Sequence, residues 1–144
     1  MPFDNDKLEA SLMSMPCEVA VKCVLPVVRS MVAKELMVKY GLKQTEVAEK
    51  LRVSQPAISL YRRKLRGKAI DLETDEDIQN QVRMVAQTLI EDKPTRRNII
   101  SKYCEICKAI RAKGLLCNLH KKFDSNIDIE MCRLCYGQDS LSCI

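Results

Sequence analysis

Residues 44–63 decide the fold, and they read Gln44-Thr45-Glu46-Val47-Ala48-Glu49-Lys50-Leu51-Arg52-Val53-Ser54-Gln55-Pro56-Ala57-Ile58-Ser59-Leu60-Tyr61-Arg62-Arg63. Apolar residues recur here twice at helical spacing, in a first set of Val47, Ala48 and Leu51 and a second set of Ile58, Tyr61 and Leu65. Since only residues 52–54 separate the sets, two short helices must pack steeply on each other. Ser54 suits the N-cap of the second helix, and Pro56 suits its first turn. The pattern predicts a helix-turn-helix, whose second helix enters a DNA major groove; a helical hairpin of a bundle is the alternative.

The stretch resembles the helix-turn-helix of Cro/C1-type (XRE) transcription regulators of phages and prokaryotes. Gln44 opens the first helix and Gln55 the second, and the resemblance implies that one glutamine braces the DNA backbone while the other reads a base. Arg52 stands where that family usually has Gly, so the turn must hold a bulky residue in a left-handed or strained conformation. The predicted DNA-binding residues are Gln44, Thr45, Ser54, Gln55, Pro56, Ser59, Arg62, Arg63, Lys64 and Arg66.

Composition bounds the class of protein. The chain has 144 residues, no Trp, two Phe and four Tyr, and it is rich in Ala, Val, Leu, Met and Lys. Such a composition favours helices over sheets, and the length allows one medium domain or two small ones. No apolar run approaches the ~18 residues of a membrane span, and the acidic start lacks the basic region of a signal peptide. We therefore expect a mostly α-helical, cytoplasmic protein that does not enter a membrane.

Positive charge is concentrated in two blocks. Residues 43–68 carry eight Lys and Arg against two Glu, and residues 93–122 carry nine against one. The acidic segment 71–77 separates them. This distribution suits contact with a polyanion such as double-stranded DNA. Ordinary solvated faces are the alternative, and they explain the second block more easily than the first.

Helical patterns continue before residue 44. One runs from Cys17 to Tyr40, and Pro26 should break or kink it at Leu25. Its first part is apolar nearly all round and must be buried, so we place a homodimer interface at residues 19–25. Gly41 should close the helix as its C′ residue.

Two further helices are expected after residue 71. The first covers residues 75–92 and could help the homodimer interface, and the second is capped by Thr95 and closed by Gly114. Basic residues of the second, including Arg111 and Lys113, could reach the DNA flank or brace a dimer. The predicted domains are a flexible arm (1–16), a helix-turn-helix domain (17–70), a helical linker or dimerisation region (71–113) and a cysteine-rich segment (104–144).

The eight cysteines point to a metal. In a reducing compartment they favour a metal site over a disulfide framework, and two C-x-x-C pairs in one short segment are typical of metal-thiolate sites. The predicted ligands are Cys104, Cys107, Cys117, Cys132 and Cys135. Cys17 and Cys23 are expected to behave as small hydrophobic residues, and Cys143 as a bystander. His120, the only histidine, is left out of this set because a lone histidine near a basic surface is usually exposed.

The identity of the metal stays open among three alternatives. Four thiolates with one to spare favour an iron–sulfur cluster of the 4Fe–4S type. Zinc is the alternative, because Cys117 and His120 together suit it, and a metal-free thiol or disulfide switch is the third. The cysteine-bearing half is also similar to a group of predicted archaeal regulators that join a Cro/C1 helix-turn-helix to a cysteine-bearing tail.

The combined prediction is a DNA-binding transcription regulator, a homodimer, whose metal segment serves as a redox or iron sensor or as a structural staple. We expect no enzymatic activity and no small-molecule substrate, because the chain has no phosphate-cradling Gly loop, no nucleophile elbow, and no strand before its C-x-x-C motifs. The alternative is an adaptor of the basal transcription machinery or the ribosome. Multiprotein bridging factors are similar in combining such a helix-turn-helix with a zinc ribbon, although their ribbon comes first.

Overall fold

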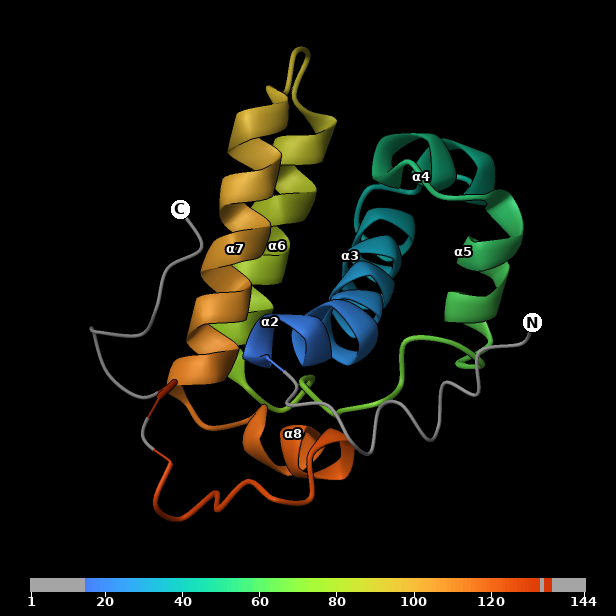
Figure 1. Cartoon of the computed structure of the whole chain (residues 1–144). Coiled ribbons are helices and arrows are strands. Elements are labelled where there is room, and N and C mark those ends of the chain that lie inside the picture. Colours follow the sequence, from blue (N-terminus) through green and yellow to red (C-terminus); the bar gives the residue numbers. More distant parts are fainter. Residues whose placement is uncertain (1–14, 133, 136–144) are drawn as a thin grey trace, which may run out of the picture.

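The computed structural model describes residues 15–132, 134 and 135, and the regular structure of these residues is entirely helical (Figure 1). The predicted mostly α-helical class is thus confirmed. In chain order the elements are α2 (Pro16–Val19), the π-helical turn η1 (Ala20–Val24), α3 (Leu25–Val38), α4 (Gln44–Leu51), α5 (Gln55–Arg62), α6 (Glu76–Ile90), α7 (Arg96–Ala112) and α8 (Cys117–Phe123).

Helix α3 is the centre of the molecule. It packs against α4 and α5 on one side and against α6 on the other, where α6 and α7 lie side by side (Figure 1). The apolar side chains of Val28, Met31, Val32 and Leu36 are buried along α3. One continuous core therefore reaches from α2 to α8, and the α4–α5 pair shares it with the α6–α7 pair.

The expected kink before Pro26 takes the form of a π-helical turn. Element η1 ends at Val24, and Pro26 lies in the first turn of α3, where it offers no N–H to the carbonyls of the preceding turn. Short π-helical stretches commonly interrupt α-helices in this way. Gly41 follows α3 with φ +65°, the left-handed conformation expected of a residue that closes a helix.

The apolar segment before the kink is buried by the chain itself. Val19, Ala20 and Val24 are almost fully buried, and α2 packs against α8. Of this segment, Val21 is 60% exposed. The apolar stripe of α6, Ile78 to Leu89, is likewise buried in the core. Most of the apolar side chains that led us to place a homodimer interface at residues 19–25 are therefore buried in the chain's own core, while Val21 stays exposed.

Capping residues fix both ends of the α6–α7 hairpin. Asp75 caps α6 by accepting a hydrogen bond from the Ile78 N–H at 3.1 Å, and Thr95 caps α7 by accepting from the Asn98 N–H at 3.2 Å. Gly114 follows α7 with φ +71°. The two helices that we expected after residue 71 are confirmed.

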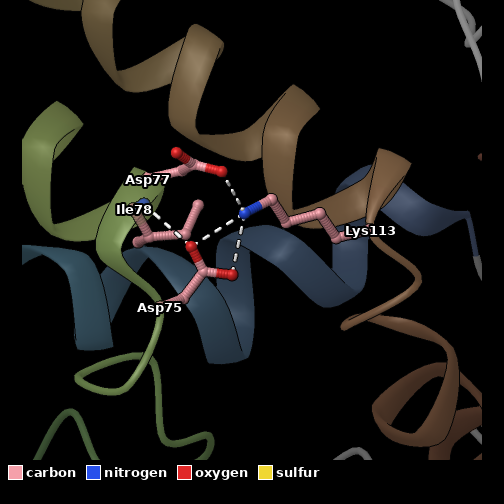
Figure 2. A network of polar contacts seen from close by, with 4 residues as sticks. All are labelled: Asp75, Asp77, Ile78 and Lys113. Carbon is pink, nitrogen blue, oxygen red and sulfur yellow. Dashed lines mark hydrogen bonds and ion pairs between the residues drawn. The ribbon is translucent and has the colours of Figure 1, made fainter.

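A polar network joins the two far ends of this hairpin (Figure 2). Lys113 Nζ lies 2.8 Å from both carboxylate oxygens of Asp75 and 2.9 Å from Asp77 Oδ2. The hydrogen bond from Lys113, followed by that from the Ile78 N–H, lowers the pKa of Asp75. Lys113 is therefore paired with two carboxylates of its own fold. We had expected it to reach the DNA flank or to brace a dimer.

Replacing Lys113 by methionine should lower the midpoint of thermal unfolding at neutral pH. A carboxyl group with a depressed pKa stabilises the fold above its unfolded pKa of about 3.9, and this contribution is lost as the pH falls through the folded pKa. The difference between wild type and Lys113→Met should therefore shrink below about pH 4. Thermal melts from pH 2 to 7 measure it, with the exposed Lys108→Met on the same helix as control. A difference independent of pH would contradict this role of Asp75.

Within the part of the chain that the structure describes, no helix is long and apolar enough to cross a membrane.

Candidate nucleic-acid interface and cysteine site

Helices α4 and α5 are joined by a tight turn of residues 52–54. Arg52 is left-handed, with φ 54° and ψ 43°, as the missing glycine led us to expect. The Val53 N–H then donates to the Ala48 carbonyl at 3.0 Å, and the half-buried Val53 side chain packs on the core. This geometry holds the two helices against each other, with Val47, Ala48 and Ile58 buried between them and α3.

The start of α5 is held by two side chains. Ser54 Oγ accepts a hydrogen bond from the Ala57 N–H at 3.3 Å, which is the predicted N-cap. Gln55 Nε2 donates to Gln44 Oε1 at 2.8 Å, so the first residues of α4 and α5 are bonded directly. Thr45, Gln55 and Pro56 are exposed beside them. The structure thus brings together the polar residues that the sequence places at the two helix starts.

A basic segment follows α5. It is not helical, although the apolar pattern predicted that the helix would continue to Leu65. Helix α5 ends at Arg62, and Arg63 is its C-cap. Lys64 adopts φ +54° and the Leu65 N–H donates to the Leu60 carbonyl at 2.9 Å, which closes the helix. Leu65 is consequently 58% exposed and does not extend the apolar stripe of α5. Arg63 still lies one turn after Ser59, since its N–H donates to the Ser59 carbonyl at 3.1 Å.

The remaining basic side chains are well placed for a polyanion. Arg62, Arg63, Lys64 and Arg66 are all exposed, while Ser59 is half-buried. The Arg66 guanidinium lies 5.7 Å from the centre of the Tyr61 ring, a cation–π distance that orients the side chain. Positive charge therefore gathers at the end of α5, opposite the polar start of the same helix.

One hydrogen bond and one groove lie between the α4–α5 pair and the α6–α7 pair. Lys50 Nζ donates to the Leu89 carbonyl at 3.0 Å and so satisfies a carbonyl at the end of α6. Between α4 and the start of α7 lies a groove of about 600 Å³, whose lining includes Leu51, Ile99 and Tyr103. Burial raises the pKa of Tyr103 to about 12, with Arg29 opposing this shift, so its hydroxyl stays neutral at physiological pH.

The predicted metal ligands fall into two groups. Cys104 and Cys107 lie on α7, three residues apart, whereas Cys117 begins α8, and Cys132 and Cys135 follow it. No disulfide joins the seven described cysteines. Among the described residues, no three Cys, His, Asp or Glu side chains already converge as metal ligands do. The predicted iron–sulfur cluster stays a prediction, and Cys143 lies outside the described residues.

Sequence reasoning missed a buried arginine beside the cysteines. Arg111 on α7 is 4% exposed. It is therefore buried, whereas we had expected it to reach the DNA flank or to brace a dimer. Burial alone would lower its pKa, but a hydrogen bond to Cys135 and the nearby sulfurs of Cys135, Cys17 and Cys107 raise the pKa above its usual value. Cys17, expected to behave as a small hydrophobic residue, thus belongs to this corner of the fold. No separate signal in the sequence distinguishes Arg111, because it lies among other basic residues.

The second group of ligand-type residues shares one small cavity. Cys117, His120, Cys132 and Cys135 line a space of about 20 Å³ together with Pro16 and three apolar side chains. His120 is 7% exposed, so the expectation of a surface histidine is wrong. Helix α8, which we did not predict, buries it by packing Leu116 and Leu119 on the core.

Comparisons with known proteins place the chain in no family: no family model, no curated protein and no solved structure matches it.

Proposed function

We propose that the protein is a sequence-specific DNA-binding transcription regulator that uses α4 and α5 as a Cro/C1-type helix-turn-helix. We also propose that its cysteine-rich segment binds a metal. The observation that carries DNA binding is the hydrogen bond between Gln44 and Gln55 at the start of an N-capped α5. It presents an oriented amide at the helix end that reads bases in this class of protein.

The amide of Gln55 keeps the groups that base reading needs. A glutamine side chain has two N–H donors and one carbonyl acceptor. One donor goes to Gln44, so the second donor and the carbonyl remain for the N7 and N6 atoms of adenine. Gln44 in turn fixes the rotamer of Gln55 before DNA arrives, which reduces the entropy lost on binding.

The basic segment after α5 supplies contacts of another kind. Arg62, Arg63, Lys64 and Arg66 are exposed cations at the far end of the helix. Such side chains bind phosphates and position a protein on the duplex without reading sequence. The α4–α5 pair therefore separates base recognition at one end of α5 from phosphate binding at the other.

Gln55→Ala should cost about 1–3 kcal/mol at one base position and relax specificity there. The measurement is fluorescence anisotropy with a sequence selected from a random DNA pool and its single-position variants, at one salt concentration. Gln44→Ala should weaken discrimination at the same position by a smaller amount, because it loosens Gln55. The exposed Gln87→Ala on α6 is the matched control. If Gln55→Ala weakened every DNA equally, base reading by this residue would be wrong.

Footprinting distinguishes a regulator from the adaptor alternative. A regulator protects a discrete site, whereas an adaptor of the transcription machinery or the ribosome leaves DNA unprotected at concentrations where it binds its protein or RNA partner. Failure to select any preferred sequence, together with such a partner interaction, would replace the proposal with the adaptor.

A two-fold homodimer is part of the proposal. One helix-turn-helix buries too little surface for tight operator binding, and dimers reading two half-sites about one helical turn apart are the usual solution. Sedimentation equilibrium at micromolar concentration should give twice the chain mass, alone or on DNA. Binding as a monomer to a site without two-fold symmetry would exclude the dimer. Val19, Ala20 and Val24 are buried in the chain's own core, so we expect the interface to lie elsewhere. Val21→Glu, at the exposed position of this segment, should leave the association unchanged.

A further inference from the structure

The cavity beside α8 combines four metal-ligand side chains. Its lining contains three thiols, from Cys117, Cys132 and Cys135, and the imidazole of His120. Cys117 and His120 are three residues apart on one helix and so project from the same side of it. Cys132 and Cys135 have the same spacing on the following segment. Paired ligands at this spacing are typical of structural zinc sites with three Cys and one His.

Turns shape the segment that carries the second pair of ligands. Asp124 Oδ1 accepts from the Asn126 N–H at 3.1 Å, and Asp128 Oδ1 accepts from the Glu130 N–H at 3.1 Å. The Cys132 N–H then donates to the Asp128 carbonyl at 2.8 Å. The segment after α8 folded in this way places Cys132 and Cys135 in the lining of the same cavity as Cys117 and His120.

We propose that Cys117, His120, Cys132 and Cys135 form a single tetrahedral zinc site, and this inference rests on the metal-binding half of the proposed function. The ligand set differs from the one expected from sequence, since it includes His120 and leaves out Cys104 and Cys107. Those two cysteines do not line the cavity.

The small size of the cavity favours a single ion over a cluster. About 20 Å³ is slightly more than the roughly 10–15 Å³ that one water molecule needs. A single Zn²⁺ fits in such a space, whereas a cube of four irons and four sulfides does not. Because the four side chains do not yet converge, zinc would draw them inward onto itself and close the cavity.

Arg111 supplies the charge that this site requires. Three thiolates around Zn²⁺ leave a net charge of −1, which is costly inside a protein unless a cation lies beside it. The buried guanidinium of Arg111 hydrogen-bonds to Cys135, and hydrogen bonds to a metal-bound sulfur are a common means of stabilising such sites. Arg111 is thus a positioning residue for the site.

The segment after α8 needs metal–ligand bonds to hold its fold. Of the apolar residues after α8, Ile127 and Ile129 are half-buried, and Met131 and Leu134 are exposed. Such a segment has too little core to hold its own fold, and ligand bonds to a metal can replace one.

Cobalt substitution of the full chain tests the proposal directly. The reduced protein, stripped of metal, is titrated anaerobically with Co²⁺ and separately with Zn²⁺. We expect one ion per chain and visible Co²⁺ bands characteristic of three thiolates and one imidazole. His120→Cys should keep the ion and shift the bands to those of four thiolates. His120→Ala and Cys117→Ser should lose tight binding, whereas Cys104→Ser and Cys107→Ser should keep the wild-type spectrum.

Several results would overturn the zinc site. These are a four-thiolate spectrum for the wild type, loss of Co²⁺ in Cys104→Ser or Cys107→Ser, and recovery of a brown protein containing iron and sulfide. The wild-type spectrum decides even where a ligand variant fails to fold. DNA binding is read separately by anisotropy, so a chain without zinc that still selects its sequence overturns only this inference. A chain that binds zinc at this site but selects no DNA sequence overturns only the regulator.

Discussion

Gly67→Ala is expected to lower the free energy of unfolding by about 2–5 kcal/mol, from left-handed strain and overpacking together. Gly67 has φ +70°, and a Cβ atom there would lie 2.6 Å from the Pro26 carbonyl oxygen and 2.9 Å from Ser30 Cβ. Both atoms belong to the first turns of α3, which is the centre of the core, so neither can move aside cheaply. Urea unfolding followed by far-ultraviolet circular dichroism measures the loss.

Gly41→Ala is the matched control for this substitution. Gly41 has φ +65°, nearly the same as Gly67, but a Cβ atom there would meet nothing within 4 Å. It should therefore cost only the strain of the left-handed conformation, about 1–2 kcal/mol. Equal losses in the two variants would mean that the close approach of Gly67 to α3 contributes nothing, and that the segment after α5 is not anchored there.

The sequence predicted those features that are decided within a few residues. Ser54 and Thr95 were recognisable as helix starts because a short polar side chain can accept from an N–H three residues on. Gly114 was recognisable as a helix end because glycine adopts the left-handed conformation without strain. The irregularity before Pro26 followed from its missing N–H, although the π-helical form of the turn did not.

Features that depend on distant residues could not be predicted. The apolar face of residues 19–25 demanded a cover, but only the fold shows that Val19, Ala20 and Val24 join a core that extends to Leu119 of α8, almost a hundred residues later. Arg111 and Lys113 are both basic residues near the end of α7, yet one is buried beside sulfurs and the other is paired with Asp75. Periodicity assigns both to a helix without revealing these partners.

The candidate cysteine site shows the same difference between features decided within a few residues and features that depend on distant residues. Spacing predicted Cys132 and Cys135 to be a pair of metal ligands, because two residues three apart can face one ligand. Spacing could not show that Cys104 and Cys107 do not line the cavity, nor that Cys17 lies near Arg111. His120 was set aside on its expected exposure, and its burial by α8 is a tertiary effect.

Neutralising the basic end of α5 should weaken binding to every DNA sequence and flatten its salt dependence. In the triple variant Arg62→Gln, Lys64→Gln and Arg66→Gln, three exposed cations lose their charge but keep most of their length. Each phosphate contact contributes about 0.9 to the slope of log affinity against log salt, so the slope should fall by about 2.7. Anisotropy titrations from low to moderate salt measure it on the selected sequence and on a scrambled one.

The ratio of the two affinities separates this effect from base reading. Phosphate contacts carry no sequence information, so the triple variant should keep the wild-type preference for the selected sequence at each salt concentration. A control triple variant, Lys108→Gln, Lys121→Gln and Lys122→Gln, changes the net charge equally at exposed positions on α7 and α8. Because those residues lie away from the α4–α5 pair, its slope should stay near that of the wild type. If both triple variants lost the same slope, long-range net charge would explain the binding, and the end of α5 would not lie on the phosphate backbone.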